Sequence, residues 1–178
     1  MKSKKYIIPL IAIIVIGVII SIFLIQNMNG CDTLENRERR LREISNLGEG
    51  TNIDQEISIG DYIISGYTTK NNRQGLAVFA PTDNGKYKLQ TNVNRENNEL
   101  VLITTTINQT PYNIFWANKA NLDYAEITYT VDGKIGKTIT VDAQDNQIVY
   151  TESPAKDYNV EYIFVDKNGT HYEWYYAK

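Results

Sequence analysis

Hydrophobic and polar positions divide the chain into an apolar N-terminal run, a short charged stretch and a long alternating region. Residues 6–25 contain no charged side chain and consist mostly of Ile, Leu, Val and Phe. As a helix that rises about 1.5 Å per residue, this run reaches about 30 Å, the thickness of the hydrocarbon core of a bilayer. The pattern predicts a transmembrane helix over residues 6–25.

The charges on either side of the apolar run predict its orientation. Lys2, Lys4 and Lys5 precede it, whereas residues 26–30 carry no charge. Positive residues flanking a membrane helix stay on the cytoplasmic side. We therefore expect residues 1–5 to form a cytoplasmic basic tail and the rest of the chain to lie outside the cell membrane, held by an uncleaved signal anchor.

The only cysteine, Cys31, follows this run directly behind Gly30 and leaves a second kind of anchor open. The stretch from Met28 to Cys31 resembles the lipobox of bacterial lipoproteins at its last two positions, although that family has Leu where Met28 stands and a small residue in place of Asn29. The resemblance implies cleavage before Cys31 and lipidation of its sulfur. We expect the uncleaved anchor, because twenty apolar residues exceed the usual 7–15 of a signal-peptide core. An incidental free thiol is the third interpretation.

A charged stretch predicts a short helix over about residues 33–47, inside a linker that spans 26–52. Asp32 or Thr33 can cap its N-terminus, and Gly48 can end it. Its apolar residues form only a narrow stripe, made of Leu34, Leu41, Ile44 and Leu47. We interpret this helix as a solvated spacer that lifts the following domain off the membrane, with a short dimer seam as the alternative.

From residue 53 to 178, apolar and polar residues alternate in short runs rich in Thr, Tyr, Val and Ile. Ala125, Ile127, Tyr129 and Val131 alternate with polar residues, which is the period of a half-buried strand. Turn residues at 83–85, 132–133 and 166–169 predict hairpins. The strands are predicted over residues 56–59, 62–68, 75–80, 86–93, 99–107, 112–117, 124–131, 137–142, 147–151, 158–166 and 170–176.

Many short strands at this spacing predict an all-β fold, an antiparallel β-sandwich of immunoglobulin-like or related architecture. The chain lacks the paired cysteines of antibody domains, so the resemblance is one of architecture only. The expected core consists of Val78, Val101, Ile103, Ile107, Ile114, Trp116, Ile127, Tyr129, Val131, Ile139, Val141, Val160, Tyr162 and Phe164.

Composition narrows the chemistry that the chain can perform. One cysteine and one histidine in 178 residues exclude an internal disulfide and a Cys/His zinc cluster. Without the three N-terminal lysines, 15 basic residues stand against 21 acidic ones, a net charge of -6 outside the membrane. That charge repels phosphate backbones, so we expect no nucleic-acid partner, and we expect no metal and no cofactor.

Catalytic motifs are missing from the sequence, and we predict that the protein is not an enzyme. His171 lies in the last predicted strand, and no Gly-x-Ser-x-Gly elbow accompanies it. The stretch from Asp166 to Gly169 begins like a calcium loop but lacks the closing Glu, so we interpret it as a hairpin turn. A hydrolase that uses paired carboxylates is left open, because sequence does not show which acids meet in a sandwich.

The aromatic residues near the C-terminus are the candidate binding surface. Tyr172, Trp174 and Tyr176 share one face of a strand and are suited to a protein partner or to sugar rings, or else belong to the core. We therefore predict a membrane-tethered, non-enzymatic binding module for a protein or cell-envelope ligand. The alternative is an accessory subunit that contacts a membrane assembly through its anchor and juxtamembrane helix. In plan the chain resembles many small Gram-positive envelope proteins.

Overall fold

A computed structural model describes residues 15–18, 21, 30–44, 47–95, 100–117, 122–142, 147–153 and 158–176. All eleven predicted strands are present in this part of the chain, and they follow one short helix, α2 (Leu34–Glu43). The largest difference is at the first strand, which begins at residue 52 rather than 56. The strands are β1 (Asn52–Ile59), β2 (Tyr62–Thr68), β3 (Gln74–Pro81), β4 (Tyr87–Arg95), β5 (Leu100–Ile107), β6 (Thr110–Ala117), β7 (Leu122–Val131), β8 (Lys134–Asp142), β9 (Gln147–Glu152), β10 (Asn159–Asp166) and β11 (His171–Tyr176).

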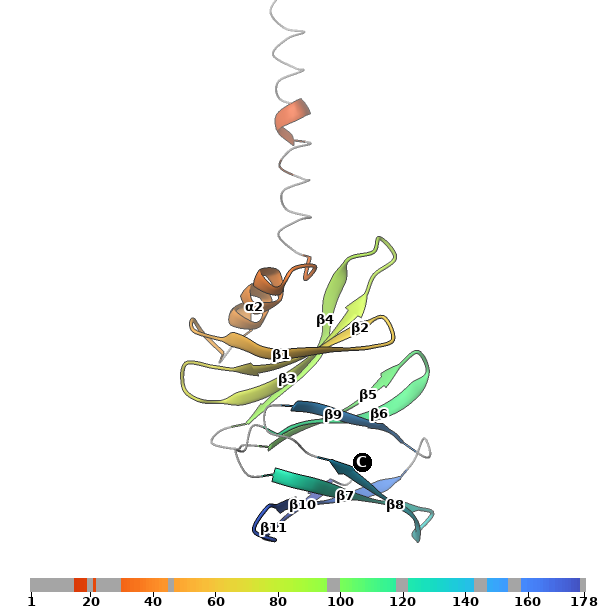
Figure 1. Cartoon of the computed structure of the whole chain (residues 1–178). Helices are drawn as coiled ribbons and strands as arrows, with labels where there is room; N and C mark the ends of the chain where they lie inside the picture. Colours follow the sequence, from red (N-terminus) through yellow and green to blue (C-terminus); the bar gives the residue numbers. More distant parts are fainter. Residues whose placement is uncertain are drawn as a thin grey trace, which may run out of the picture.

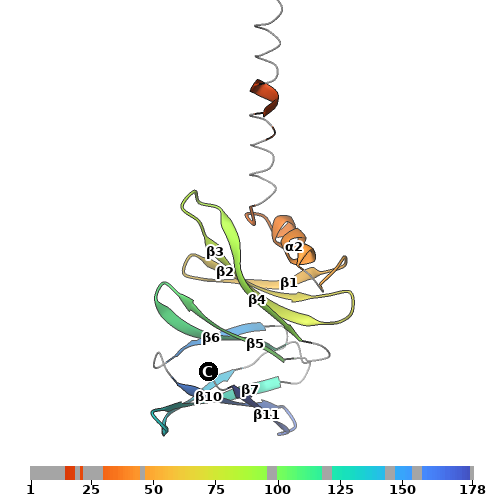
Figure 2. The same cartoon turned by 180° about the vertical axis from the view of Figure 1, so that it is seen from behind.

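The described strands form three antiparallel sheets, with the orders β1-β2-β3-β4, β5-β6-β9 and β11-β10-β7-β8. The sheets stack on one another, and α2 lies on the outer face of the first sheet (Figure 1). The view from behind gives the same order of layers (Figure 2). The prediction of an antiparallel all-β fold is confirmed, and the stack is deeper than a simple sandwich because β1–β4 add a sheet of their own.

Tight turns fix the hairpins where the sequence predicts them. Gly85 joins β3 to β4, and Asp132 with Gly133 joins β7 to β8, all with positive φ angles. A hydrogen bond from the Gly169 amide to the Asp166 carbonyl closes the turn between β10 and β11. Successive positive φ angles at Asp132 and Gly133 give a turn whose twist matches the flanking strands, which explains the Asp-Gly pair.

Each interface in the stack encloses its own hydrophobic cluster. The first lies between α2 and β1–β4 and includes Leu41, Tyr67 and Phe79. The second lies between β1–β4 and β5-β6-β9, and the third lies between β5-β6-β9 and the four-stranded C-terminal sheet. The described part of the chain therefore has three hydrophobic cores in series.

The central sheet is buried on both faces, and its sequence explains how. In β6, Ile114 and Trp116 belong to the second cluster, while the intervening Phe115 belongs to the third. A strand covered on both sides has a continuous apolar run instead of alternation. Of the predicted core residues, Val131, Ile139 and Val141 are only partly buried, because they lie on or beside the outer strand β8, and the others are buried.

Helix α2 is part of the folded domain, which corrects the interpretation of a solvated spacer. Its N-cap is Thr33, whose hydroxyl accepts from the Asn36 amide, and it ends at Glu43 because Ile44 has an extended backbone. Leu41 is completely buried against the first sheet. The apolar stripe thus packs on the domain at Leu41, Ile44 and Leu47, whereas Leu34 at its N-terminal end is exposed.

The predicted transmembrane segment, residues 6–25, lies mostly outside the described residues. Residues 15–18 and 21 are helical, and the Ser21 hydroxyl donates to the Gly17 carbonyl over 2.8 Å. Among the residues described, none belongs to a helix that is both long and apolar enough to span a membrane.

Candidate functional site

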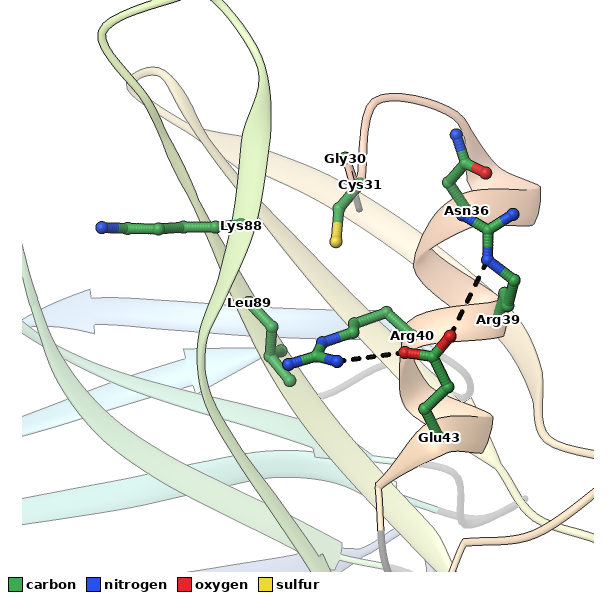
Figure 3. A pocket seen from close by; sticks show the side chains of 8 residues that line it. All are labelled: Gly30, Cys31, Asn36, Arg39, Arg40, Glu43, Lys88 and Leu89. Carbon is green, nitrogen blue, oxygen red and sulfur yellow. Dashed lines mark hydrogen bonds and ion pairs between the residues drawn. The ribbon is translucent and has the colours of Figure 1, made fainter. Parts of the chain in front are cut away.

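A pocket of about 320 Å³ lies between α2 and β4 (Figure 3). It is found where the chain enters the folded domain, and it brings together residues from the entering segment, the helix and the strand. The lining residues are Gly30, Cys31, Asn36, Arg39, Arg40, Glu43, Lys88 and Leu89.

Charges in this pocket are largely compensated. Glu43 accepts from Arg40 over 3.0 Å and lies 4.0 Å from Arg39, so one carboxylate serves both guanidinium groups. The Lys88 side chain extends away from the helix (Figure 3). The pocket therefore offers modest positive charge and no acid–base pair of the kind that catalysis uses.

Cys31 lies at the inner wall of the pocket with only 1% of its surface exposed. Burial raises the pKa of its thiol, and the hydrogen bond from the Leu89 backbone and the charges of Arg40 and Arg37 only partly oppose this. A thiol is a poor nucleophile while protonated. At neutral pH this cysteine behaves as a small core residue.

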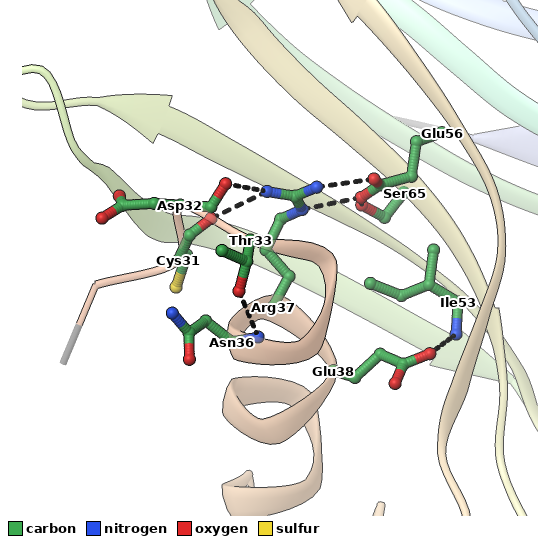
Figure 4. Close-up of polar contacts among 9 residues, drawn as sticks. All are labelled: Cys31, Asp32, Thr33, Asn36, Arg37, Glu38, Ile53, Glu56 and Ser65. Carbon is green, nitrogen blue, oxygen red and sulfur yellow. Dashed lines mark hydrogen bonds and ion pairs between the residues drawn. The ribbon is translucent and has the colours of Figure 1, made fainter. Parts of the chain in front are cut away.

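Arg37 joins the entering segment to the first sheet in an arrangement that we name the Arg37 clamp. Its guanidinium donates to both carboxylate oxygens of Glu56, over 2.8 and 2.7 Å. The same group donates to the backbone carbonyls of Cys31 and Asp32, over 2.9 and 3.1 Å (Figure 4). Ser65 donates its hydroxyl to the Glu56 carboxylate. The clamp therefore holds the segment before α2 against β1 and β2.

The sequence contains a signal for this clamp in the position of Arg37. Arg37 lies three residues after Leu34 and four before Leu41, so it occupies the same helix face as the apolar stripe. A cation on a buried face requires an acidic partner on the surface that it packs against. The identity of that partner, Glu56, depends on tertiary contact and is not readable from the sequence.

The three C-terminal aromatic residues lie on β11, in the sheet farthest from α2 (Figure 1). The strand register places Tyr172 opposite Phe164, Trp174 opposite Tyr162 and Tyr176 opposite Val160. These partners on β10 are buried in the third cluster. The structure does not bring the aromatic residues near Cys31, the other predicted site residue.

A second aromatic group, which sequence reasoning missed, lies on β6 and β9 of the central sheet. Its members are Tyr112, Tyr150 and Glu152, which we name the Tyr112–Tyr150 patch. The two rings meet edge to face with centroids 6.0 Å apart, and the Tyr112 hydroxyl donates to the Glu152 carboxylate over 3.2 Å. Tyr150 is 46% exposed. Desolvation and the Glu152 carboxylate raise the pKa of Tyr112, so its hydroxyl stays a donor. Only the pairing of two distant strands reveals this group.

The hairpin interpretation of Asp166 is confirmed. Its carboxylate accepts from the backbone amides of Asn168 and Thr170, over 2.9 and 2.8 Å. His171 lies directly after this turn and opposite Val165. Within the described ranges, no three His, Cys, Asp or Glu side chains are grouped as metal ligands.

The chain was compared with known protein families and with curated proteins. No family model matches it, and no curated protein is similar to it.

Proposed function

We propose that the protein is a membrane-tethered, extracytoplasmic β domain that binds a protein or a cell-envelope ligand without performing catalysis. The exposed Tyr112–Tyr150 patch on the central sheet is the observation that carries the proposal. Aromatic side chains beside a hydrogen-bonding carboxylate are typical of contact surfaces, because the rings supply apolar area and the polar groups supply direction.

The proposed tether is the N-terminal apolar segment. Val15, Ile16 and Val18 are 50%, 56% and 52% exposed. If this segment lay in water, these large aliphatic side chains would be exposed to solvent. The bond from Ser21 to the Gly17 carbonyl supports the same environment, since a hydroxyl in lipid needs an acceptor within its own helix. The basic N-terminal tail then stays in the cytoplasm.

An uncleaved anchor is favoured over lipidation at Cys31. The Cys31 side chain is packed in the first cluster beside Leu41, Tyr67 and Phe79. A lipid chain on its sulfur would have to leave that cluster and open the contact between α2 and the sheet. The intact mass of the membrane-extracted protein tests this choice: the full-length mass supports the anchor, and a mass that starts at a lipidated Cys31 refutes it.

We further infer that β5–β11 form an immunoglobulin-like sandwich, to which α2 and β1–β4 are added. In that architecture the first, second and fifth strands share one sheet and the third, sixth and seventh share the other. The seven strands from β5 onward have this division, except that the fourth strand, β8, pairs with the third and not with the fifth. Tyr158, just before β10, lies where that architecture places a tyrosine near the start of its sixth strand, although its hydroxyl bonds the Ser153 and Asn113 side chains, whereas the tyrosine of that architecture bonds the backbone.

The Tyr112–Tyr150 patch is the first choice for the contact surface, and Tyr172, Trp174 and Tyr176 are the second. Tyr150 is exposed, whereas the register sets the three C-terminal aromatic residues opposite buried partners. If the second group belongs to the core, replacing it with serine unfolds the domain. If it is the surface, the same replacement leaves the fold intact and abolishes partner capture.

Site-specific photo-crosslinking in cells tests the proposal. A photoreactive amino acid in place of Tyr150 is expected to give a discrete cross-linked product, which mass spectrometry identifies as protein or glycan. The matched control is the same amino acid in place of Thr138, which is exposed on β8. Equal cross-linking at both positions, or none at position 150, would refute the patch as a binding surface.

The alternative role, an accessory subunit that acts through its anchor and α2, is tested by exchange of residues 1–29. An unrelated transmembrane segment with the same orientation is expected to restore partner capture if the β domain does the binding. Loss of capture in a chain that still folds and still reaches the membrane favours the alternative.

A further inference from the structure

We propose that the α2 end of the domain rests on the lipid headgroups of the membrane that holds the anchor, and that the Arg37 clamp fixes the domain in this orientation. The inference rests on the membrane tether proposed above. It adds an interaction surface, the exposed first turn of α2 at Leu34, and a partner, the headgroup layer of the bilayer.

The length of the connecting chain sets the height of the domain. Residues 26–30 join the end of the apolar run, Ile25, to the first described residue of the folded domain, Gly30. Five residue steps reach at most about 18 Å, even when fully extended. The headgroup layer itself occupies about 5–7 Å of this distance. Gly30 therefore lies within about 12 Å of the headgroups, roughly the diameter of one helix.

Directly after Gly30, hydrogen bonds hold the chain to the folded domain. The Cys31 amide donates to the Tyr87 carbonyl over 3.0 Å, and the Tyr87 amide donates to the Asp32 carboxylate over 3.0 Å. Arg37 holds the two carbonyls that follow, those of Cys31 and Asp32, and is itself fixed to Glu56 (Figure 4). The tether therefore includes no residue beyond Gly30, and its short length keeps α2 at the membrane.

The surface near the tether suits contact with a headgroup layer of any charge. Leu34, in the first turn of α2, is a large apolar side chain that is 47% exposed. Arg39 and Arg40 share Glu43, so electrostatic attraction to anionic lipid is weak. Tether length and Leu34 therefore determine the contact, which is expected equally in neutral and anionic membranes and at high salt.

Fluorescence quenching in vesicles measures this orientation. The full-length chain carries Cys31→Ala and one new cysteine, either Leu34→Cys or Thr138→Cys, labelled with a small dye. It is inserted into phosphatidylcholine vesicles that contain headgroup spin-labelled lipid. Thr138 lies three layers farther out, at about 10 Å per layer. The label at position 34 is expected to be quenched at least five-fold more strongly than the label at position 138.

An insertion separates tether length from folding. Twelve Gly/Ser residues between Asn29 and Gly30 leave the clamp intact and add about 19 Å of average reach. Quenching at position 34 is expected to fall at least two-fold in this variant. Glu56→Ala tests the clamp itself and is expected to reduce the difference between positions 34 and 138, and the insertion remains decisive if Glu56→Ala does not fold.

Two results would overturn the inference, and a separate result concerns the tether. Equal quenching at positions 34 and 138 would show that the orientation is not fixed. Quenching that requires phosphatidylglycerol in the vesicles would show that charge, and not tether length, brings α2 to the surface. Flotation of the vesicles reports on the anchor independently: protein that does not float refutes the proposed tether, whereas protein that floats with position 34 unquenched refutes only the orientation.

Discussion

Removing the Glu56 carboxylate is expected to lower the free energy of unfolding by about 3 kcal/mol. In the Glu56→Ala variant the Arg37 guanidinium loses both of its carboxylate acceptors. Its side chain is only 8% exposed, so water replaces those acceptors poorly. Breaking a buried ion pair from one side costs about 3–5 kcal/mol, because a charge is left without compensation.

The geometry places the loss at the lower end of that range. Glu56 is 24% exposed, so part of the pair is screened by solvent. Arg37 also keeps its bonds to the carbonyls of Cys31 and Asp32 after the carboxylate is removed. For a chain of this length, a loss of about 3 kcal/mol corresponds to a fall in melting temperature of about 6–12 °C.

Urea unfolding of the full-length protein in detergent micelles measures the effect. Tryptophan fluorescence is a suitable signal, since Trp116 is completely buried between two sheets. The matched control is Arg40→Ala, which removes an ion pair whose members, Arg40 and Glu43, are 52% and 51% exposed and which should cost less than about 1 kcal/mol. If Glu56→Ala costs no more than Arg40→Ala, the clamp does not stabilise the fold. The double variant Arg37→Met/Glu56→Leu should recover most of the loss, because it leaves no unpaired charge.

Three further predictions concern other residues of the fold. Gly75→Ala should destabilise the domain by about 1–3 kcal/mol, because the new Cβ would overlap the Tyr67 ring. The control is Gly136→Ala, whose new Cβ would have its nearest neighbour 3.5 Å away and which should leave the free energy of unfolding nearly unchanged in the same urea assay. Asn113→Ala should lower the free energy of unfolding by about 1–3 kcal/mol, because the buried Tyr129 hydroxyl loses the amide donor 2.9 Å away. Asn113→Asp keeps an acceptor but has no donor, so it should not restore the lost stability. Burial raises the pKa of Tyr67 and Tyr129 above the ordinary 10.0, so the folded state holds these two protons more tightly than the unfolded state does. The free energy of unfolding should therefore be unaffected below pH 10 and should decrease as the pH rises beyond it. If the melting temperature of Tyr67→Phe decreases with pH as steeply as that of the parent, this prediction is wrong.

Strand positions were predictable because local patterns set them. Alternation in β7 places Ala125, Ile127 and Tyr129 on the buried face, and the Asp-Gly turn that follows fixes the hairpin to β8. Such signals act over a few residues and are written directly in the sequence.

The stacking of the sheets was not predictable in the same way, because it depends on contacts between distant strands. Gln55 accepts from the Ile148 amide over 2.8 Å and so joins β1 to β9 across more than ninety residues. The sequence around Gln55 is typical of an exposed strand and does not indicate this contact between β1 and β9. The Tyr112–Tyr150 patch is hidden for the same reason, since its two strands are adjacent only in the fold.

Because the central sheet is covered on both faces, the order in which its strands are synthesised affects folding. Strands β1 to β4 are consecutive hairpins and can pair as soon as residue 95 has emerged, because each pairs with the strand next to it in the chain. The central sheet is complete only when β9, which begins at Gln147, joins β6. Until then the inner face of the first sheet, with Ile64, Leu76 and Val78, has only part of its cover. The apolar inner face of the first sheet therefore stays partly exposed until β9 has been synthesised. During this interval aggregation competes with folding.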